Sequence, residues 1–274
     1  MIDTATRIIV VKLGGDVLEE PALTTVATSF AQAARENTAT RFVVVHGGGA
    51  QVTALCQRLG LTTQTIGGRR VTDEATLDVL QMVVAGRLNI ALCAALHRTG
   101  THAVGLHAGS AAIRATLRPP RLITGGPPHP VDLGLVGDVV GFDVELVQTL
   151  WSAQRVPVLS CLGLSQEGAV LNVNADLVAS RLAIDVGATV MIAVTGVGGV
   201  RTDANNPNTR IARLDTAGAD AAIVRGEVKG GMIAKLEEAC AALAAGVKAV
   251  HIVGPAEIAA TLADPGSVGT VLVA

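Results

Sequence analysis

Residues 7–15 read RIIVVKLGG, an aliphatic run that ends in a lysine, a leucine and two glycines. Residues 41–49 have the same arrangement and read RFVVVHGGG. A run of β-branched residues without polar alternation is typical of a strand that is buried on both faces, as in a parallel sheet covered by helices. Helical patterns follow at 21–36 and 51–59. The two stretches therefore predict parallel strands of an α/β sheet.

The same alternation continues along the chain. Further strands are expected at 103–106, 156–159, 189–194 and 249–253, and further helices at 74–98, 144–153, 174–184 and 232–245. Five prolines and two glycines crowd residues 119–130, which predicts a loop or hairpin outside the sheet. If the molecule has two lobes, we expect the boundary near Gly168, because a second set of strands and helices begins there.

The composition excludes several classes of protein. Of the 274 residues, 50% are apolar and 16% are charged, which is far from the composition of a disordered chain. Tyr is absent, and there are one Trp and three Phe, so a module that stacks nucleic-acid bases is excluded. The 21 basic residues face 23 acidic ones, and this balance provides no basic field for nucleic acid.

Location and redox chemistry follow from the same reading. No charge-free run reaches the roughly 18 apolar residues of a membrane span, and the N-terminus lacks the pattern of a secretory leader. We therefore expect a cytoplasmic protein without a membrane partner. The four cysteines are scattered and form no CxxC pair, which predicts reduced thiols and no zinc site; they are Cys56, Cys93, Cys161 and Cys240.

Glycine turns follow the first two strands. Lys12 precedes Gly14 and Gly15, and the second strand ends at His46 before three glycines. Bare backbone N–H groups beside a cation form an anion-binding concavity, and ligands of open α/β sheets bind at the carboxyl ends of strands. These turns indicate a phosphate site. A tight turn with a surface lysine is the alternative, and the spacing matches neither a Walker A loop nor a dinucleotide fingerprint.

Three further motifs carry polar groups. GGRRVTD (67–73) holds an arginine pair suited to a carboxylate, or else two solvated charges. NVNAD (172–176) contains a helix N-cap candidate, Asn174, so Asp176 is either part of a cap or an orienting group for cations. GGMIAK (230–235) places a lysine in a first helical turn, where the helix dipole disfavours it unless an anion lies nearby.

This inventory contains two lysines, an aspartate and three glycine turns, but no hydrolase elbow or paired histidines. Phosphoryl transfer needs mostly positioning and charge stabilisation. A carboxylate acceptor is already ionised at neutral pH and needs no general base. We therefore favour phosphoryl transfer, with Mg²⁺ carried by the nucleotide and no metal site of the chain's own.

In their order and separations, VKLGG, VHGGGAQ, GRRVTD, NVNAD and GGMIAK resemble the amino acid kinase superfamily, and most closely its N-acetyl-L-glutamate kinase family. The resemblance runs nearly end to end. It implies a three-layer αβα sandwich around a central, mostly parallel open sheet. It also implies an acyl-amino-acid-binding and dimerisation lobe at 1–167, a nucleotide-binding lobe at 168–274, and a homodimer. The implied reaction uses ATP and Mg²⁺ to make an acyl phosphate on the γ-carboxylate of N-acetyl-L-glutamate, in arginine biosynthesis.

The resemblance also implies roles for individual residues. Lys12 and Lys235 would stabilise charge on the transferring phosphoryl group, and Asp176 would hold both lysines. The residues implied for the acyl amino acid are Gly48, Gly49, Arg70 and Asn172. The residues implied for the nucleotide are Gly14, Gly15, Gly47, Thr195, Gly198, Lys229 and Gly231.

The chain departs from the family pattern in two places. The family commonly has an aspartate after the Thr or Ser that ends the strand before the nucleotide loop, whereas here Gly196 follows Thr195. The loop at 107–113, HAGSAAI, lacks a common Gly-Asp pair. We expect the first departure to affect nucleotide affinity or base preference and the second to affect side-chain specificity.

Two alternative functions are compatible with the same motifs. A kinase for another N-acylated acidic amino acid, of the aminoadipate type, would keep the same chemistry. A non-catalytic ligand-binding paralogue would not need the lysines and the aspartate. Because Lys12 comes so early, we expect no additional N-terminal helix, and hence a homodimer without arginine feedback.

Overall fold

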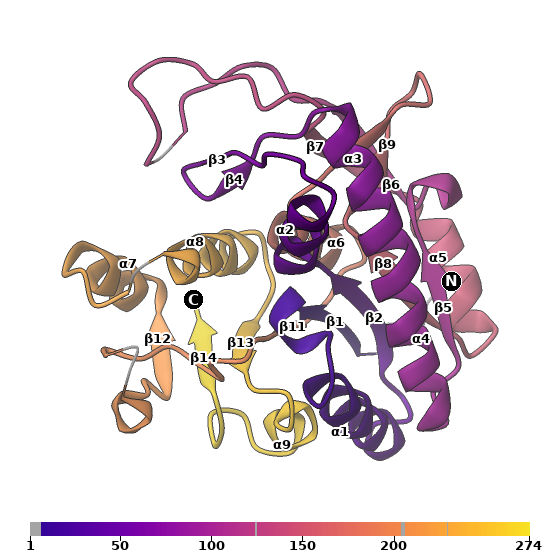
Figure 1. The fold of residues 1–274 in the computed structure, drawn as a ribbon. Coiled ribbons are helices and arrows are strands. Elements are labelled where there is room, and N and C mark those ends of the chain that lie inside the picture. The colour runs from indigo at the N-terminus through magenta and orange to yellow at the C-terminus, as the bar shows by residue number, and fades with distance from the viewer. Residues whose placement is uncertain (1–6, 124, 204–205, 229) are drawn as a thin grey trace.

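A computed structural model describes residues 7–123, 125–203, 206–228 and 230–274. Its central feature is an eight-stranded sheet (Figure 1), in which β1 (Ile8–Leu13) pairs with β2 (Arg41–His46) on one side and with β11 (Val190–Val194) on the other. Both pairs are parallel, as predicted. Beyond β2 lie β8 (Val156–Ser160) and β5 (Ala103–Leu106), and beyond β11 lie β13 (Ala249–Val253), β14 (Thr270–Val273) and β12 (Arg213–Asp215). Among the described strands of this sheet, β13 and β14 form the one antiparallel pair.

Both faces of the sheet are covered because the aliphatic strands have no polar side. Along β1, Ile9 and Val11 contribute to one core, whereas Ile8 and Val10 contribute to the other. The first core is closed by α1 (Ala22–Glu36), α2 (Gly49–Arg58), α3 (Glu74–Leu80), α4 (Asn89–Arg98) and α9 (Ile258–Ala263). The second is closed by α5 (Val144–Ser152), α6 (Ala175–Asp185), α7 (Thr216–Val224) and α8 (Gly231–Ala244). This arrangement confirms the predicted αβα sandwich.

The predicted helix at 74–98 is one continuous helical run that changes its winding. A π-helical segment, η2 (Gln81–Leu88), joins α3 to α4. Asp73 caps the start, because its carboxylate accepts a hydrogen bond from the N–H of Thr76 at 2.8 Å. The run is long and apolar enough to cross a membrane by length and composition alone, but half of its most apolar window is buried inside the protein. It packs against α1 and β5, as a core helix does.

A second, smaller sheet is the main element that the sequence reading missed. Its strands are β10 (Val170–Asn172), β9 (Leu162–Leu164), β6 (Ile113–Leu117) and β7 (Gly137–Phe142), in spatial order. A two-stranded ribbon, β3 (Thr65–Ile66) and β4 (Arg69–Arg70), lies on the same side of the molecule (Figure 1). These strands are two to six residues long and are separated by loops, so the hydrophobic pattern of each is too short to predict a strand from sequence.

Short 3₁₀ turns complete the described elements. They are η1 (Gly15–Val17), η3 (Ala108–Ser110) and η4 (Pro207–Thr209). The expected division between residues 167 and 168 falls in the turn between β9 and β10, which pair with each other. The large sheet is continuous between the two expected lobes, because β1 and β11 are neighbours.

Candidate active site

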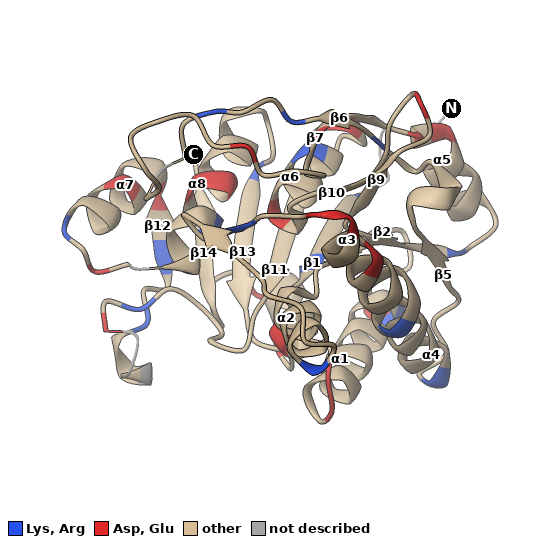
Figure 2. Ribbon diagram, turned by 45° about the horizontal axis from the view of Figure 1, so that its top comes forward, with Lys and Arg blue, Asp and Glu red and all other residues tan. Residues whose placement is uncertain are grey.

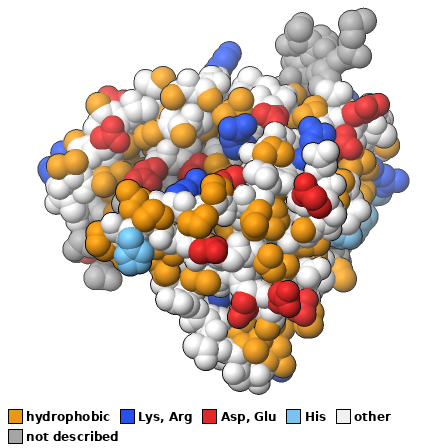
Figure 3. Space-filling model, turned by 90° about the horizontal axis from the view of Figure 1, so that it is seen from above, with side chains coloured by type: hydrophobic (Ala, Val, Ile, Leu, Met, Phe, Trp, Pro, Cys, Tyr) orange, Lys and Arg blue, Asp and Glu red, His pale blue; other side chains and the backbone are white. Residues whose placement is uncertain are grey.

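A cavity of about 710 Å³ opens at the carboxyl ends of β1 and β2 and is lined by residues of both expected lobes. The ribbon coloured by charge shows basic and acidic segments around this edge of the sheet (Figure 2). Seen from above, charged side chains lie inside a hollow of the surface (Figure 3). The edge is the one at which ligands of open α/β sheets bind.

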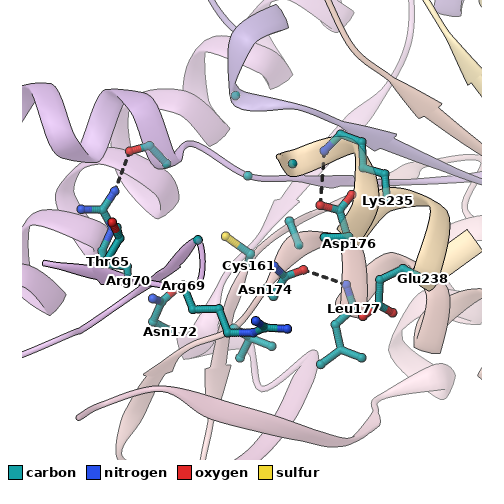
Figure 4. Close-up of a pocket in the computed structure, with 18 of the residues that line it drawn as sticks. Thr65, Arg69, Arg70, Cys161, Asn172, Asn174, Asp176, Leu177, Lys235 and Glu238 are labelled. Atoms are coloured by element: carbon teal, nitrogen blue, oxygen red, sulfur yellow. Dashed lines mark hydrogen bonds and ion pairs between the residues drawn. The ribbon is translucent and has the colours of Figure 1, made fainter. Parts of the chain in front are cut away.

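Lys12, Asp176 and Lys235 meet in this cavity. Lys12 Nζ lies 2.6 Å from Asp176 Oδ1. Lys235 Nζ lies 3.5 Å from Asp176 Oδ2, and Figure 4 shows these two side chains pointing toward each other. The Lys12 side chain is only 5% exposed, and a buried ammonium is tolerated only where it is paired. The structure thus brings together the three residues that the motifs singled out.

Local geometry explains how Asp176 reaches the lysines. Asn174 is the N-cap of α6, as predicted, and its side chain accepts a hydrogen bond from Leu177 N at 3.0 Å. The cap places Asp176 in the first turn of α6, which packs against β1. Lys12 lies on the same face of β1 as Val10, and that face is turned toward α6.

The charges of the cluster do not cancel. Burial alone raises the pKa of Asp176, but the positive charges of Lys12 and Lys235 and their hydrogen bonds hold it below its ordinary value. Burial, and next the charge of Lys12, lower the pKa of Lys235, although Asp176 opposes the shift. Two ammonium groups that share one carboxylate leave an excess positive charge, which suits a phosphate or carboxylate ligand.

Some backbone amides of the glycine turns donate hydrogen bonds within the protein, and others do not. Gly14 N donates to Val194 O at 3.0 Å, and Gly47 N donates to Leu13 O at 3.2 Å. The expectation that Gly14 and Gly47 present free amides is therefore wrong, because hydrogen bonds between neighbouring strands extend one residue past the end of each strand. By contrast, no described residue accepts a hydrogen bond from the amide of Gly15 or Gly48, and both glycines line the cavity.

Asp16 is a cavity residue that the motif reading missed. Its Oδ2 accepts a hydrogen bond from Gly196 N at 2.6 Å and so ties the turn after β1 to the turn after β11. A Cβ atom on Gly196 would lie 3.0 Å from that oxygen. The Asp16 carboxylate therefore occupies the space beside Gly196, where the sequence lacks an acid. Its position next to the VKLGG motif was the available signal.

Arg70 is poised for an anion. Its Nη2 donates to Gly49 O at 2.8 Å and to Thr53 Oγ1 at 2.7 Å. Its Nη1 is buried without a partner among the described residues. Burial lowers the pKa of Arg70. An unsatisfied buried guanidinium N–H is costly, so Arg70 would gain from an anionic ligand that brings an acceptor to it.

Of the other predicted site residues, some line the cavity and some lie outside it. Asn172 lines the cavity, and its Nδ2 donates to Thr72 Oγ1 at 3.0 Å. Gly49 and Gly231 line it as well. Thr195 and Gly198 lie outside it, in a turn where Gly198 N donates to Thr195 O at 3.3 Å, so this cavity gives no support for their expected contact with the nucleotide. Lys229 lies outside the described residues.

Other cavity residues had no sequence signal. They are Arg118, Arg121, Cys161, Glu237 and Glu238 among others, and Arg69, the other member of the predicted arginine pair, also lines the cavity. Figure 4 shows the Arg69 side chain directed away from Arg70 and toward Leu177. Glu238 is partly buried and accepts a hydrogen bond from Ser180 Oγ at 3.1 Å, and burial raises its pKa.

Two lysines that share a partly buried aspartate, beside free glycine amides at the carboxyl edge of a parallel sheet, define a phosphate-handling site of the phosphotransferase class. The model of the amino acid kinase family matches residues 7–254, and the chain belongs to that family.

Named relatives cover nearly the whole chain. An acetylglutamate kinase from Sorangium cellulosum is 49% identical, over 99% of this chain and 96% of that protein. One from Anaeromyxobacter dehalogenans is 48% identical, over 98% and 99%. Among solved structures, smu.665 from Streptococcus mutans has a TM-score of 0.77 at 25% identity, over 97% of this chain and 98% of that one.

Proposed function

We propose that this chain is an acetylglutamate kinase, which transfers the γ-phosphoryl group of ATP to the γ-carboxylate of N-acetyl-L-glutamate in arginine biosynthesis. The observation that carries the proposal is the cluster of Lys12, Asp176 and Lys235 inside the cavity. The names of relatives at 48–49% identity over nearly the whole chain support the choice of acceptor.

The reaction needs little covalent help from the protein. A carboxylate oxygen of the acceptor attacks the γ-phosphorus, the bond from that phosphorus to the bridging oxygen breaks, and ADP leaves with the electron pair. The acceptor is already ionised, so no proton has to be removed. Lys12 and Lys235 stabilise negative charge on the group in transit, and Asp176 keeps the two cations close together.

Mg²⁺ enters the proposal as a companion of the nucleotide. No three His, Cys, Asp or Glu side chains among the described residues are grouped so that they could hold a metal ion. The cavity residues fit a Mg²⁺ ion whose ligands are mainly phosphate oxygens of the nucleotide. The Asp16 carboxylate lies in the same cavity and could contribute an oxygen. When bound, the ion would neutralise charge on the phosphates.

We assign the acceptor to the side of the cavity that holds Arg70. The unpaired Nη1 of Arg70 suits the α-carboxylate of the acyl amino acid, and Asn172 and Gly49 lie in the same cavity. The nucleotide phosphates would take the amides of Gly15 and Gly231 beside the two lysines. We also propose that 1–167 is the acyl-amino-acid-binding and dimerisation lobe and 168–274 the nucleotide-binding lobe, with Asn172 and Gly15 each serving the ligand of the other lobe.

We further propose that the protein is a cytoplasmic homodimer. Met82 is 58% exposed and Ile90 is 67% exposed, and they lie two helical turns apart on the 74–98 helix. Exposed apolar groups on one helix side suit a protein interface. Light scattering of the wild type and Ile90→Asp tests this: a dimer that the charge weakens supports the proposal, and a wild-type monomer or hexamer contradicts it.

A hydroxylamine trap of the acyl phosphate tests the reaction. MgATP would be combined separately with N-acetyl-L-glutamate, free L-glutamate and N-acetyl-L-aminoadipate, with Lys12→Ala as the inactive control. Hydroxamate formed mainly from N-acetyl-L-glutamate supports the proposal. A signal mainly from another acceptor keeps the chemistry and changes the substrate. Nucleotide binding without any hydroxamate favours the non-catalytic alternative.

A further inference from the structure

His46 is a buried histidine that the reaction above does not use. It ends β2, immediately before the three glycines, and has no exposed surface. Its Nδ1 lies 3.0 Å from Gly47 O, and its Nε2 lies 3.0 Å from Asn89 Nδ2. Burial lowers the pKa of His46 to about 4, so the ring is neutral at physiological pH. One nitrogen therefore donates a hydrogen bond and the other accepts one.

The neighbours of the ring decide which nitrogen carries the proton. Asn89 Nδ2 also lies 3.1 Å from Val158 O, which can only accept, so this atom of Asn89 is the amide nitrogen. An amide nitrogen has hydrogens but no lone pair to offer, so His46 Nε2 must accept. The proton is then on Nδ1, which donates to Gly47 O.

Asn89 is itself held in place. It is 4% exposed, at the start of α4. Cys93 Sγ lies 3.9 Å from its Oδ1, and a Cβ atom on Gly105 of β5 would lie 2.0 Å from the same oxygen. Gly105 therefore leaves space for the Asn89 amide, which fixes the acceptor side of the imidazole.

This network orients one peptide plane of the glycine turn. Gly47 N is bound by Leu13 O, and Gly47 O is bound by His46. In a trans peptide the C=O and the following N–H point in opposite directions. Because Gly47 O faces the buried ring, Gly48 N–H faces the other way. Gly48 lines the cavity, and no described residue accepts a hydrogen bond from its amide.

We propose that His46 is a positioning residue: as an Nδ1–H donor held by Asn89, it locks the Gly47–Gly48 peptide so that the Gly48 amide points into the cavity and binds the carboxylate of the phosphoryl acceptor. The identity of that ligand rests on the proposed function, whereas the locked peptide does not. A preorganised amide avoids the cost of reorienting when the ligand arrives.

Two isosteric amides test the donor position. His46→Asn places an N–H where Nδ1 stands, and His46→Gln places one near Nε2 and leaves the Nδ1 position empty; His46→Leu has neither. We expect His46→Asn to keep the acceptor KM within about threefold, and His46→Gln and His46→Leu to raise it about tenfold or more, since one charge-assisted hydrogen bond is worth about 1.5–3 kcal/mol. The KM for ATP should change little in all three.

Equal acceptor KM values for the Asn and Gln variants, or a matching rise in the KM for ATP, would overturn the proposal. Thermal unfolding of each variant separates these effects from loss of the fold. The ¹⁵N shifts of the His46 ring in the wild type give a second measurement that needs no activity. A protonated Nδ1 with a bare Nε2, unchanged between pH 6 and 8, supports the network, and the opposite tautomer rejects it. Absence of acceptor phosphorylation by the wild type would instead reject the proposed function alone.

Discussion

Lys12 Nζ lies 2.6 Å from Asp176 Oδ1, so this ion pair joins the carboxyl end of β1 to the first turn of α6. Lys235, from α8, approaches the other oxygen of the same carboxylate at 3.5 Å. One carboxylate thus holds two cations in a cavity where each cation would otherwise repel the other.

Asp176→Asn should lower kcat by about 10²–10³-fold, because the two ammonium groups lose the charge that keeps them together. The amide keeps the size of the side chain, so the change in kcat should exceed the change in thermal stability. Steady-state kinetics and thermal unfolding measure the two effects. A variant with wild-type kcat would show that Asp176 is only a helix-terminal charge.

The lowered pKa of Lys235 predicts that activity is lost at a less alkaline pH than an ordinary lysine would allow. Burial and the charge of Lys12 lower its pKa from the ordinary 10.5, so Lys235 loses its proton as the pH rises through this lowered value, and an uncharged amine cannot stabilise phosphoryl charge. The profile of kcat/KM for ATP reports the free enzyme and should therefore fall below pH 10.5. Lys235→Arg keeps its proton and should move this limit to higher pH. An unchanged limit in the arginine variant would assign the loss to another group.

The contact between Asp16 and Gly196 predicts that a substitution at one position partly restores the ATP affinity lost by a substitution at the other. Asp16→Ala removes the acceptor of Gly196 N–H and should raise the KM for ATP about tenfold or more, by the value of one charge-assisted hydrogen bond. Gly196→Asp alone should also raise it, because its Cβ would lie 3.0 Å from Asp16 Oδ2 and the two carboxylates would repel.

The double variant Asp16→Ala/Gly196→Asp should recover part of this loss. The described atoms within 4 Å of a Cβ on Gly196 all belong to Asp16, so truncating Asp16 opens the space for a carboxylate on the β11 turn. ATP kinetics of the four proteins measure the coupling. Losses that simply add would show that the two positions do not share one carboxylate site.

The raised pKa of Glu238 predicts that replacing this residue changes the stability of the fold by an amount that depends on pH. Burial raises its pKa above the ordinary 4.5, so the folded protein binds this proton more tightly than the unfolded chain does. The stabilisation is complete at low pH and is lost as the pH rises through the raised pKa. Glu238→Gln removes the penalty on the charged form while its amide oxygen can still accept from Ser180.

Thermal unfolding at two pH values measures that effect. At pH 7.5 we expect Glu238→Gln to raise Tm by about 1–3 °C, a small effect because the carboxylate is only partly buried. Near pH 4 the difference should disappear, because the wild-type residue is then protonated. The same difference at both pH values would contradict a role for its ionisation.

The regular part of the fold could be predicted from local pattern. Aliphatic runs at 7–13 and 41–46 and helical periodicity at 74–98 correspond closely to β1, β2 and the α3–α4 run. These elements have long patterns because each buries a whole face or both faces. The small sheet at 113–117 and 137–142 could not be read in the same way, because its strands are short and joined by irregular loops.

The sequence by itself determined the chemical inventory: two lysines, an aspartate, an arginine pair and three glycine turns, each in a motif at the end of a predicted strand or the start of a predicted helix. Chain order alone could not show which glycine amides are free. The tertiary structure decided that, because Gly14 and Gly47 are bound by neighbouring strands while Gly15 and Gly48 are not. It also decided that Asp16 fills the space beside Gly196 and that Asn89 holds the His46 ring, which in turn binds the Gly47 carbonyl. The physical reason is that hydrogen bonds and steric exclusion act over a few ångströms in space, between residues that the sequence places far apart.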